Sequence, residues 1–322
     1  MKKFLNEVKH IETELLEGLA FAHGDLLALE QGNLVVNKKL EAANRVTIVA
    51  LGLTGNEPAL SGYVGQGMVD IVVAGPVFTA PGPATCVEAL KLADRGQGSI
   101  LIVPNHTGFT LTGSLAIKEA ARLGLKAAQV VVGDDAAEGR GLLGLVPLCK
   151  ILGAAAAGGC SLEELVALAG KVNSGMATLA VAASGATHPV TGQQLASVEA
   201  GMVAYGAGLH GETAAKLLPL ESANSVAQLV MDALLEKLQP KPGAQVLLLV
   251  SGSGSTSLME QLIVFRSCYG YLLEQGLQVV ASKVGELLTV QETAGLQLSL
   301  VLMDQQLLTY WQASCNTPYF KN

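Results

Sequence analysis

The sequence predicts an α/β fold of two α/β domains, each a mostly parallel sheet flanked by helices. The chain has 322 residues, 50% of them hydrophobic, which is enough to form two cores. Glycine is abundant, at 37 residues, and aromatics make up only 4%, a composition typical of proteins with many tight strand-to-helix turns. Short apolar runs also alternate with helix-like stretches. We expect domains 1–180 and 181–322.

The first half begins with an expected amphipathic helix, because apolar residues from Phe4 to Leu19 recur at helical spacing. Four short apolar runs then predict buried strands. The predicted strands are 46–51, 71–74, 99–103 and 128–132, and the helix-like stretches between them are 84–93 and 114–123. Strands that alternate with helices imply a parallel sheet covered on both faces.

The second half begins after an Ala/Gly-rich helical region, 146–159. Ser161-Leu-Glu-Glu164 has the pattern of a capping box and predicts the start of another helix. The remaining expected strands are 176–182, 244–250, 277–281 and 296–303, and the expected helices are 225–238 and 257–275.

Charge and hydropathy exclude several functional classes. The net charge is −7 and the only basic runs are Lys2-Lys3 and Lys38-Lys39, so we expect no direct binding to nucleic acid or to an anionic membrane. A membrane-spanning helix needs ~20 apolar residues, and the best candidate is interrupted by His188-Pro189. The N-terminus does not resemble a signal peptide. Five cysteines without CxxC spacing fit a reducing cytoplasm and no zinc site.

Two loops that follow predicted strands carry polar residues. In Leu51-Gly-Leu-Thr-Gly-Asn-Glu-Pro58, glycine would let the backbone approach a small ligand, although a tight turn satisfied by Asn56 is the favoured interpretation of the residues alone. In Asn105-His-Thr-Gly108, His106 is a candidate for polar chemistry or a hydrogen-bonded structural residue. Both loops lie at the carboxyl ends of strands, where ligands bind in open α/β sheets.

A third loop, Gly206-Ala-Gly-Leu-His-Gly-Glu212, places a histidine among glycines with a carboxylate two residues on. Neutral imidazole is a nucleophile, and a carboxylate on its other nitrogen would fix the tautomer. A binding site and an ordinary loop remain equally good interpretations of these residues.

Two glycine-rich segments, 62–67 and 251–256, have no Walker lysine, and the first lacks GxGxxG order. They are therefore poor candidates for nucleotide sites. For 251–256 we expect close backbone packing at a domain or subunit contact.

Taken together, these loops resemble the DhaK family, the dihydroxyacetone-binding subunits of dihydroxyacetone kinases. The resemblance covers nearly the whole chain. Its motifs are Gly55-x-Glu57-Pro58, Gly62-Tyr-Val-Gly-x-Gly-Met68, Phe78-Thr79-x-Pro81, Asn105-x-Thr-Gly108, Gly208-x-His-Gly-Glu212, Gly252-x-Gly-x-Thr256, Lys283-Val-Gly285 and Thr317-Pro318. The resemblance implies two α/β domains, a homodimer, and covalent capture of dihydroxyacetone by His210 as a hemiaminal. Glycerol has no carbonyl carbon to attack, so it would not be captured.

The sequence also departs from the family at the positions that move protons. Asn56 stands where family kinases have a histidine, within G-S-G-H-E-P, and Phe109 stands where they have an aspartate. Pro104 replaces a common lysine, Thr213 replaces a proline, and Leu288-Thr-Val-Gln291 replaces Met-Thr-Ser-Leu. Loss of a general acid or base typically costs ~10²–10⁴-fold in rate.

The resemblance therefore implies a site that retains His210, which would bind the ketone, and lacks the two proton-transfer groups at positions 56 and 109. His106 is the remaining candidate base. By resemblance we expect the substrate-binding residues to be Thr54, Gly55, Asn56, Pro104, His106, Gly208 and His210.

Three functions follow from the resemblance, all in glycerol metabolism. The first is a non-catalytic paralogue similar to the DhaQ co-activators, which bind dihydroxyacetone and act through a TetR-type transcription factor. The second is a dihydroxyacetone (glycerone) kinase subunit. This chain would then bind no cofactor itself, and a separate DhaL-like subunit would carry ADP or ATP with Mg. The third is a structural partner in a heterodimer. Another short ketone is an alternative ligand.

Overall fold

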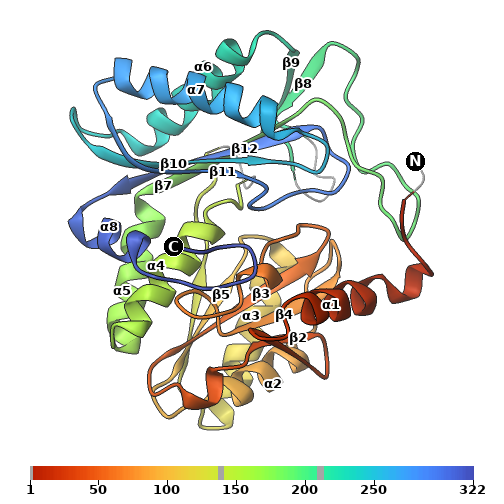
Figure 1. Cartoon of the computed structure of the whole chain (residues 1–322), viewed down its shortest axis with the longest axis vertical. Coiled ribbons are helices and arrows are strands. Elements are labelled where there is room, and N and C mark those ends of the chain that lie inside the picture. The colour runs from red at the N-terminus through yellow and green to blue at the C-terminus, as the bar shows by residue number, and fades with distance from the viewer. Residues whose placement is uncertain (1–2, 137–140, 209–213) are drawn as a thin grey trace.

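The computed structural model describes residues 3–136, 141–208 and 214–322. It contains two six-stranded sheets flanked by helices, the sheet of the first half lying below that of the second half in Figure 1. The predicted two-domain α/β fold is confirmed. Within the described ranges, no helix is both long enough and apolar enough to cross a membrane.

The first sheet has the strand order β1-β2-β4-β3-β5-β6. Its strands are β1 (Leu27–Glu30), β2 (Leu34–Asn37), β3 (Thr47–Thr54), β4 (Ile71–Val77), β5 (Ser99–Val103) and β6 (Ala127–Val131). The four strands that the sequence predicted are parallel to one another. The hairpin β1–β2 at the edge is antiparallel, and the sequence did not predict it because each strand has only four residues.

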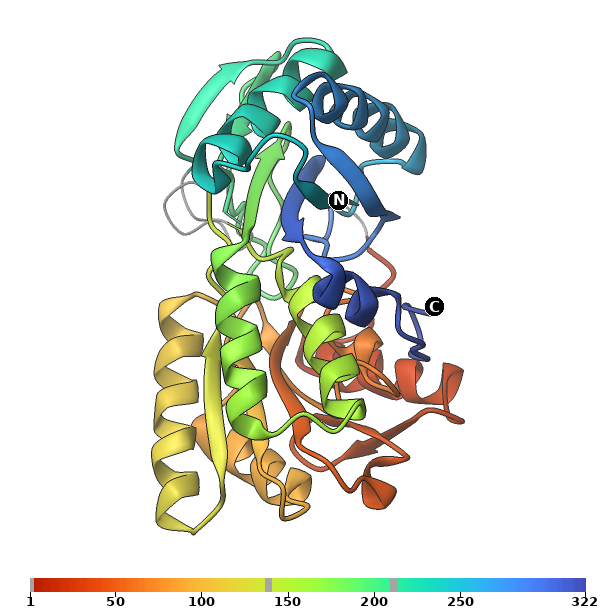
Figure 2. The same ribbon diagram turned by 90° about the vertical axis from the view of Figure 1, so that its left-hand side faces the viewer.

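Five helices accompany this sheet: α1 (Ile11–Ala22), α2 (Pro83–Ala93), α3 (Thr107–Arg122), α4 (Leu145–Ala157) and α5 (Leu162–Ser174). α2 and α3 cover one face, and α4 and α5 cover the other (Figure 2). The capping box predicted for α5 is confirmed, since Ser161 and Glu164 bond to each other's backbone N–H. α3 begins at Thr107 rather than at residue 114, so Phe109 lies within a helix.

The second sheet has the order β11-β10-β12-β7-β8-β9. Its strands are β7 (Met176–Ala182), β8 (Met202–Tyr205), β9 (Lys216–Pro219), β10 (Gln245–Gly252), β11 (Gln278–Gly285) and β12 (Gly295–Met303), and its helices are α6 (Ala223–Leu238), α7 (Leu258–Glu274) and α8 (Gln305–Gln312). The hairpin β8–β9 and helix α8 were not predicted. The division expected at residue 180 remains a prediction and falls within β7, whose residues all pair in this sheet.

This second sheet is not mostly parallel, which corrects the expectation from the sequence. Only β10 and β11 run parallel, and the other four pairings are antiparallel. Parallel neighbours need a long crossover connection, usually a helix. α7 supplies one between β10 and β11, whereas the chain returns from β11 to β12 through a loop.

One hydrophobic cluster belongs to both domains. It includes Ile48 of β3, Leu148 of α4 and Leu247 of β10. α4 packs closely against the first domain at Gly153, where a Cβ would lie 2.3 Å from the carbonyl oxygen of Met68. The two sheets therefore share a core, which fixes one relative to the other.

The segment after α8 returns to the first domain and pairs with the glycine-rich segment 62–67. The N–H of Asn316 donates to the carbonyl of Gln66 at 2.9 Å, and the N–H of Gln66 donates back at 3.1 Å. A Cβ on Gly67 would lie 2.6 Å from the carbonyl oxygen of Ser314. These glycines make room for the C-terminal tail, which accounts for a motif that the sequence left without a function.

Asp134 joins the two domains just after β6. Its side chain is fully buried and accepts the N–H of Gly144, before α4, at 2.8 Å. Its carbonyl accepts the N–H of Thr178 in β7 at 2.5 Å. Burial raises the pKa of Asp134 to about 6, the neighbouring charge of Asp135 adds to the rise, and the hydrogen bonds oppose it.

Replacing Gly67 by alanine should destabilise the protein more than the same change at Gly96. Both glycines have φ near +80° (79° and 76°), but Gly96 has no atom within 4 Å of a Cβ. The strain from positive φ is therefore similar in the two variants. The difference between their free energies of unfolding measures the clash with the C-terminal tail, which we expect to cost about 2 kcal/mol. Urea denaturation of the two variants measures it, and equal midpoints would contradict this role for Gly67.

Asp134→Asn should flatten the dependence of stability on pH. The folded-state pKa lies above the unfolded value, so the folded state binds this proton more tightly and its stability falls as pH rises through the interval from 3.8 to about 6. Asparagine can still accept the N–H of Gly144 and has no proton to lose. Thermal unfolding at pH 4, 5, 6 and 7 tests this, and identical slopes for the wild type and the variant would contradict it.

Candidate functional site

Two of the candidate loops lie side by side at one edge of the first sheet. β3 and β5 are parallel neighbours, so the segments that follow them, Thr54–Asn56 and Pro104–His106, leave the sheet at the same end. The edge formed by the carboxyl ends of parallel strands is where open α/β sheets bind ligands.

The loop after β3 has little conformational freedom. Gly55 has φ 106°, and a Cβ there would lie 2.5 Å from the ring of Phe78, so the position requires glycine. The Gly55 N–H donates to both carboxylate oxygens of Glu57, at 3.0 and 3.1 Å. Thr54 is buried and its hydroxyl donates to the carbonyl of Gly75 at 3.2 Å. Burial raises the pKa of the Glu57 carboxyl, and the Gly55 hydrogen bond opposes that rise.

The same loop is bonded to the β11–β12 loop of the second domain. Asn56 is buried, and its Nδ2 donates to the carbonyl of Thr289 at 2.6 Å. The N–H of Thr289 donates to the carbonyl of Asn56 at 3.2 Å, and the N–H of Gln291 donates to that of Gly55 at 3.2 Å. The Thr289 hydroxyl donates to the carbonyl of Glu57 at 2.6 Å. We call this set of bonds the 55–291 ladder.

The segment 251–256 packs against the β11–β12 loop and forms hydrogen bonds with its backbone. The Ser251 hydroxyl accepts the N–H groups of Leu287 and Leu288, each at 3.1 Å. A Cβ on Gly254 would lie 2.4 Å from the backbone nitrogen of Glu292. The expected close backbone packing is therefore present, but it lies within the second domain; the expected domain or subunit contact of this segment stays a prediction.

The loop after β5 exposes His106, whereas Pro104 and Phe109 on either side of it are buried. His106 is exposed and stands at the N-cap of α3. Pro104 is buried, and Phe109 is only 2% exposed, packed among residues between the sheet and helices α2 and α3. The rings of His106 and Phe109 meet edge to face with centroids 6.3 Å apart. Position 109 therefore contributes a core side chain.

Asp135 is a residue of this edge that the sequence analysis missed. Its carboxylate accepts the Nδ2 of Asn105 at 2.9 Å, and its backbone carbonyl accepts the ammonium of Lys237 on α6. Burial raises the pKa of Asp135, and its hydrogen bonds to Gly141 and Asn105 oppose the rise. The signal was available, because Gly133-Asp-Asp135 follows a predicted strand that neighbours the one before Asn105.

His210 lies outside the described residues, so the structure gives it no position. The structure does describe the two ends of the loop that contains His210, at residues 206–208 and at Ala214. The N–H groups of Gly206 and Ala207 donate to the carbonyl of Ala180 in β7, at 2.9 and 3.2 Å. Gly208 lines a cavity of about 220 Å³. The chain resumes at Ala214, which lines the same cavity just before β9.

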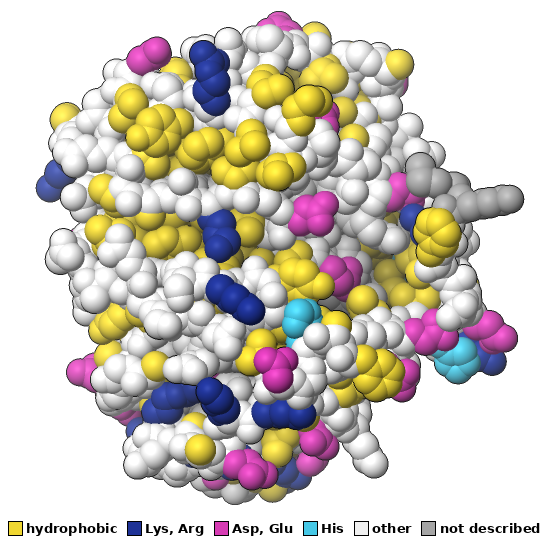
Figure 3. Space-filling view, viewed as in Figure 1, with side chains coloured by type: hydrophobic (Ala, Val, Ile, Leu, Met, Phe, Trp, Pro, Cys, Tyr) yellow, Lys and Arg dark blue, Asp and Glu magenta, His cyan; other side chains and the backbone are white. Residues whose placement is uncertain are grey.

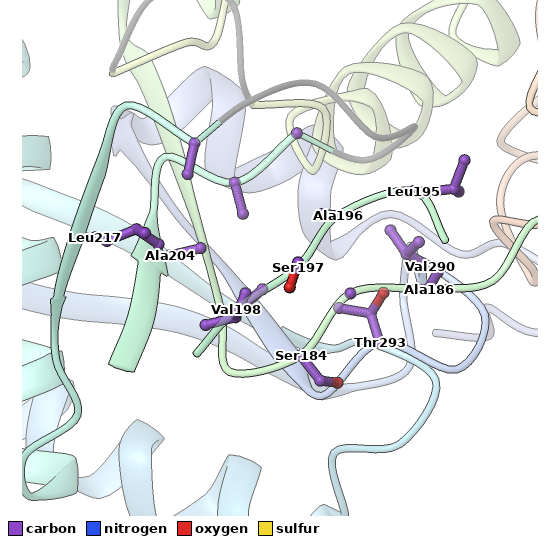
Figure 4. Close-up of a pocket in the computed structure, with 15 residues that line it drawn as sticks. Ser184, Ala186, Leu195, Ala196, Ser197, Val198, Ala204, Leu217, Val290 and Thr293 are labelled. Carbon is purple, nitrogen blue, oxygen red and sulfur yellow. The ribbon is translucent and has the colours of Figure 1, made fainter. Parts of the chain in front are cut away.

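Figure 4 shows this cavity, whose wall comes from three segments. They are the β7–β8 loop, with Ser184 and Ser197; the β8–β9 hairpin, with Ala204; and the β11–β12 loop, with Val290 and Thr293. Most lining residues are small and apolar, with a few hydroxyl groups. The β11–β12 loop therefore contacts the Asn56 loop through Thr289 and the cavity through Val290.

The described residues bring together Thr54, Gly55, Asn56, Pro104 and His106 at one edge of the first sheet, and Gly208 at the cavity in the second domain. No group of three or more potential metal-ligating His, Cys, Asp or Glu side chains occurs among them. The cavity beside Gly208 is lined by residues of the second domain alone, and the β11–β12 loop connects it to the Asn56 loop of the first domain.

Comparison with known proteins agrees with this arrangement. Residues 17–319 match the model of the Dak1 domain family. The chain is 37% identical over 317 residues, covering 95% of both chains, to the dihydroxyacetone-binding subunit DhaK of a PTS-dependent dihydroxyacetone kinase of Listeria innocua.

Two solved structures are also similar. A dihydroxyacetone kinase operon co-activator, Dha-DhaQ, superposes with a TM-score of 0.90 at 29% identity, over 97% of this chain and 98% of that one. The dihydroxyacetone kinase of C. freundii superposes with a TM-score of 0.90 at 28% identity, over 99% of this chain and 60% of that one. The chain therefore belongs to the DhaK family of Dak1-domain proteins.

Proposed function

We propose that this protein captures dihydroxyacetone, or a similar short ketone, on His210. The unprotonated ring nitrogen would bond to the carbonyl carbon, the carbonyl oxygen would take up a proton to become a hydroxyl, and the other ring nitrogen would release its proton, so that the addition is neutral overall. No heavy-atom group leaves, so reversal needs only the opposite proton movement, and water can carry the proton in both directions. Family membership and the small, hydroxyl-bearing cavity beside Gly208 support this proposal.

We further propose that the protein acts as a ligand-sensing co-activator of a TetR-type regulator rather than as a kinase. The main observation behind this step is what the side chains at positions 56 and 109 do in the structure. Asn56 donates its amide to Thr289 and cannot titrate, and Phe109 is packed in the core. Phosphoryl transfer to a hydroxyl needs a base for the departing proton, and loss of such a group typically costs ~10²–10⁴-fold. A cytoplasmic homodimer remains the expected state.

A kinase subunit is the second candidate, because the relative in Listeria innocua is named as part of a kinase. His106 is exposed at the same edge of the sheet as Asn56 and would be the base. A separate DhaL-like subunit would then have to supply the nucleotide and Mg.

The ketone proposal predicts binding of dihydroxyacetone but not of glycerol. Calorimetric titration of the wild type should show saturable binding of the ketone, and His210→Ala should abolish it, because the alanine has no nucleophile. Glycerol is the matched ligand control, since it differs only at the carbonyl. Equal binding of the two ligands, or full binding by His210→Ala, would overturn covalent capture.

The co-activator proposal predicts that the protein supports no phosphoryl transfer to dihydroxyacetone above background. With a DhaL-like subunit loaded with ATP and Mg, product formed from dihydroxyacetone should stay at the background level for both the wild type and His106→Ala. The homologous DhaK of Listeria innocua serves as the positive control. Turnover by the wild type that disappears in His106→Ala would instead establish the kinase.

A further inference from the structure

A groove runs along α1 on the first domain. It consists of two adjoining cavities, of about 520 and 330 Å³, that share Glu14, Leu15 and Glu57. One wall is α1 and the other is the loop that follows β3. Figure 3 shows a hollow to the right of centre, with hydrophobic side chains inside it and acidic side chains near its rim. We call it the α1 groove.

The floor of the α1 groove is apolar and its charged groups are all acidic. Leu15, Leu19 and Pro58 line it together with the ring of Tyr319. Its charged residues are Glu14, Glu57 and Glu286, and no lysine or arginine is among the described residues that line the two cavities. An apolar floor with acidic groups is complementary to an arginine or lysine side chain, which buries an aliphatic stem and keeps a cationic head.

Gly18 is a second, independent observation. It lies inside α1, where glycine costs about 1 kcal/mol relative to alanine, and it lines the groove. No heavy atom lies within 4 Å of the place where its Cβ would stand. Packing within the chain therefore does not require a glycine here. A glycine that leaves the helix surface bare at a groove allows the close approach of another chain.

The groove is also connected to the candidate site. Glu57 lines both of its cavities, accepts the N–H of Gly55, and through its carbonyl accepts the hydroxyl of Thr289. A cation placed against Glu57 would therefore act on the loop that carries Asn56 and on the 55–291 ladder.

We propose that the α1 groove binds a segment of a partner protein in which an arginine or lysine is flanked by apolar side chains. The cation lies against Glu57 and Glu286, and an apolar neighbour packs over Gly18 between Leu15 and Leu19. This inference rests on the proposed sensing function and deepens it, because it names the surface and the chemistry through which ketone occupancy reaches a partner.

The probe is the peptide acetyl-Leu-Arg-Leu-amide, and its control is the same peptide with citrulline, which keeps the shape and removes the charge. Both are titrated against ¹⁵N-labelled protein by NMR. We expect the arginine peptide to bind in the millimolar range and at least about threefold more tightly than the citrulline peptide, since part-exposed charge pairs contribute modestly. Equal binding of the two peptides, or none below about 10 mM, overturns the proposal.

Gly18→Leu is the decisive variant, because it fills the groove while improving helix propensity. Gly170→Leu is its matched control: this glycine also lies in a helix, α5, with no atom within 4 Å of a Cβ. We expect Gly18→Leu to weaken the arginine peptide at least about tenfold, Glu286→Gln to weaken it about threefold, and Gly170→Leu to leave it unchanged. Wild-type binding by Gly18→Leu overturns the proposal.

Titration of the same proteins with dihydroxyacetone separates the two proposals. Peptide binding that depends on Gly18 in a protein that binds no ketone would refute the sensing function and leave the groove in place. Ketone binding without peptide binding would refute the groove alone.

Discussion

The 55–291 ladder is the contact on which the geometry of the candidate site depends. It joins backbone and side-chain groups that are more than two hundred residues apart in sequence (233 for Asn56 and Thr289), and so it holds the carboxyl edge of the first sheet against the second domain. Because Asn56 is buried, its amide needs these partners, since an unpaired buried polar group is costly. The ladder also sets the β11–β12 loop, whose Val290 and Thr293 line the cavity beside Gly208.

Other contacts keep the ladder in place. Ser251 binds the β11–β12 loop from beneath, the hydroxyl of Tyr63 donates to the carbonyl of Leu287, and the C-terminal tail pairs with Gln66. All of them lie around a core to which both sheets contribute. Two domains that share a core are restricted in relative motion, so ligand binding is expected to act through loops rather than through a wide hinge.

The sequence predicted the parts of this structure that have local signals. Apolar runs predicted the central strands of the first sheet, and the expected parallel arrangement placed Asn56 and His106 at the carboxyl ends of strands. The edge hairpins were missed because four-residue strands depend on their neighbours for stability. The prediction that the second sheet is mostly parallel was wrong, because apolar runs do not encode strand direction. The contact between Asn56 and Thr289 could not be predicted, since nothing local marks a pairing of two distant loops.

The two main departures from the family pattern, Asn56 and Phe109, both make structural contacts in this protein. The resemblance aligns Asn56 with a histidine of the kinases, and the segment that it aligns with Met-Thr-Ser-Leu, 288–291, is the one to which Asn56 bonds. The resemblance aligns Phe109 with an aspartate, and Phe109 fills a core between the sheet and its helices. A carboxylate buried there would meet apolar neighbours and a large desolvation cost. A domain contact and a packing contact thus occupy the two positions at which the resemblance leads us to expect proton-transfer groups. A substitution back to histidine or aspartate at one of these positions would therefore disturb its surroundings, and this coupling supports our proposal of a binding protein over the alternative of a kinase.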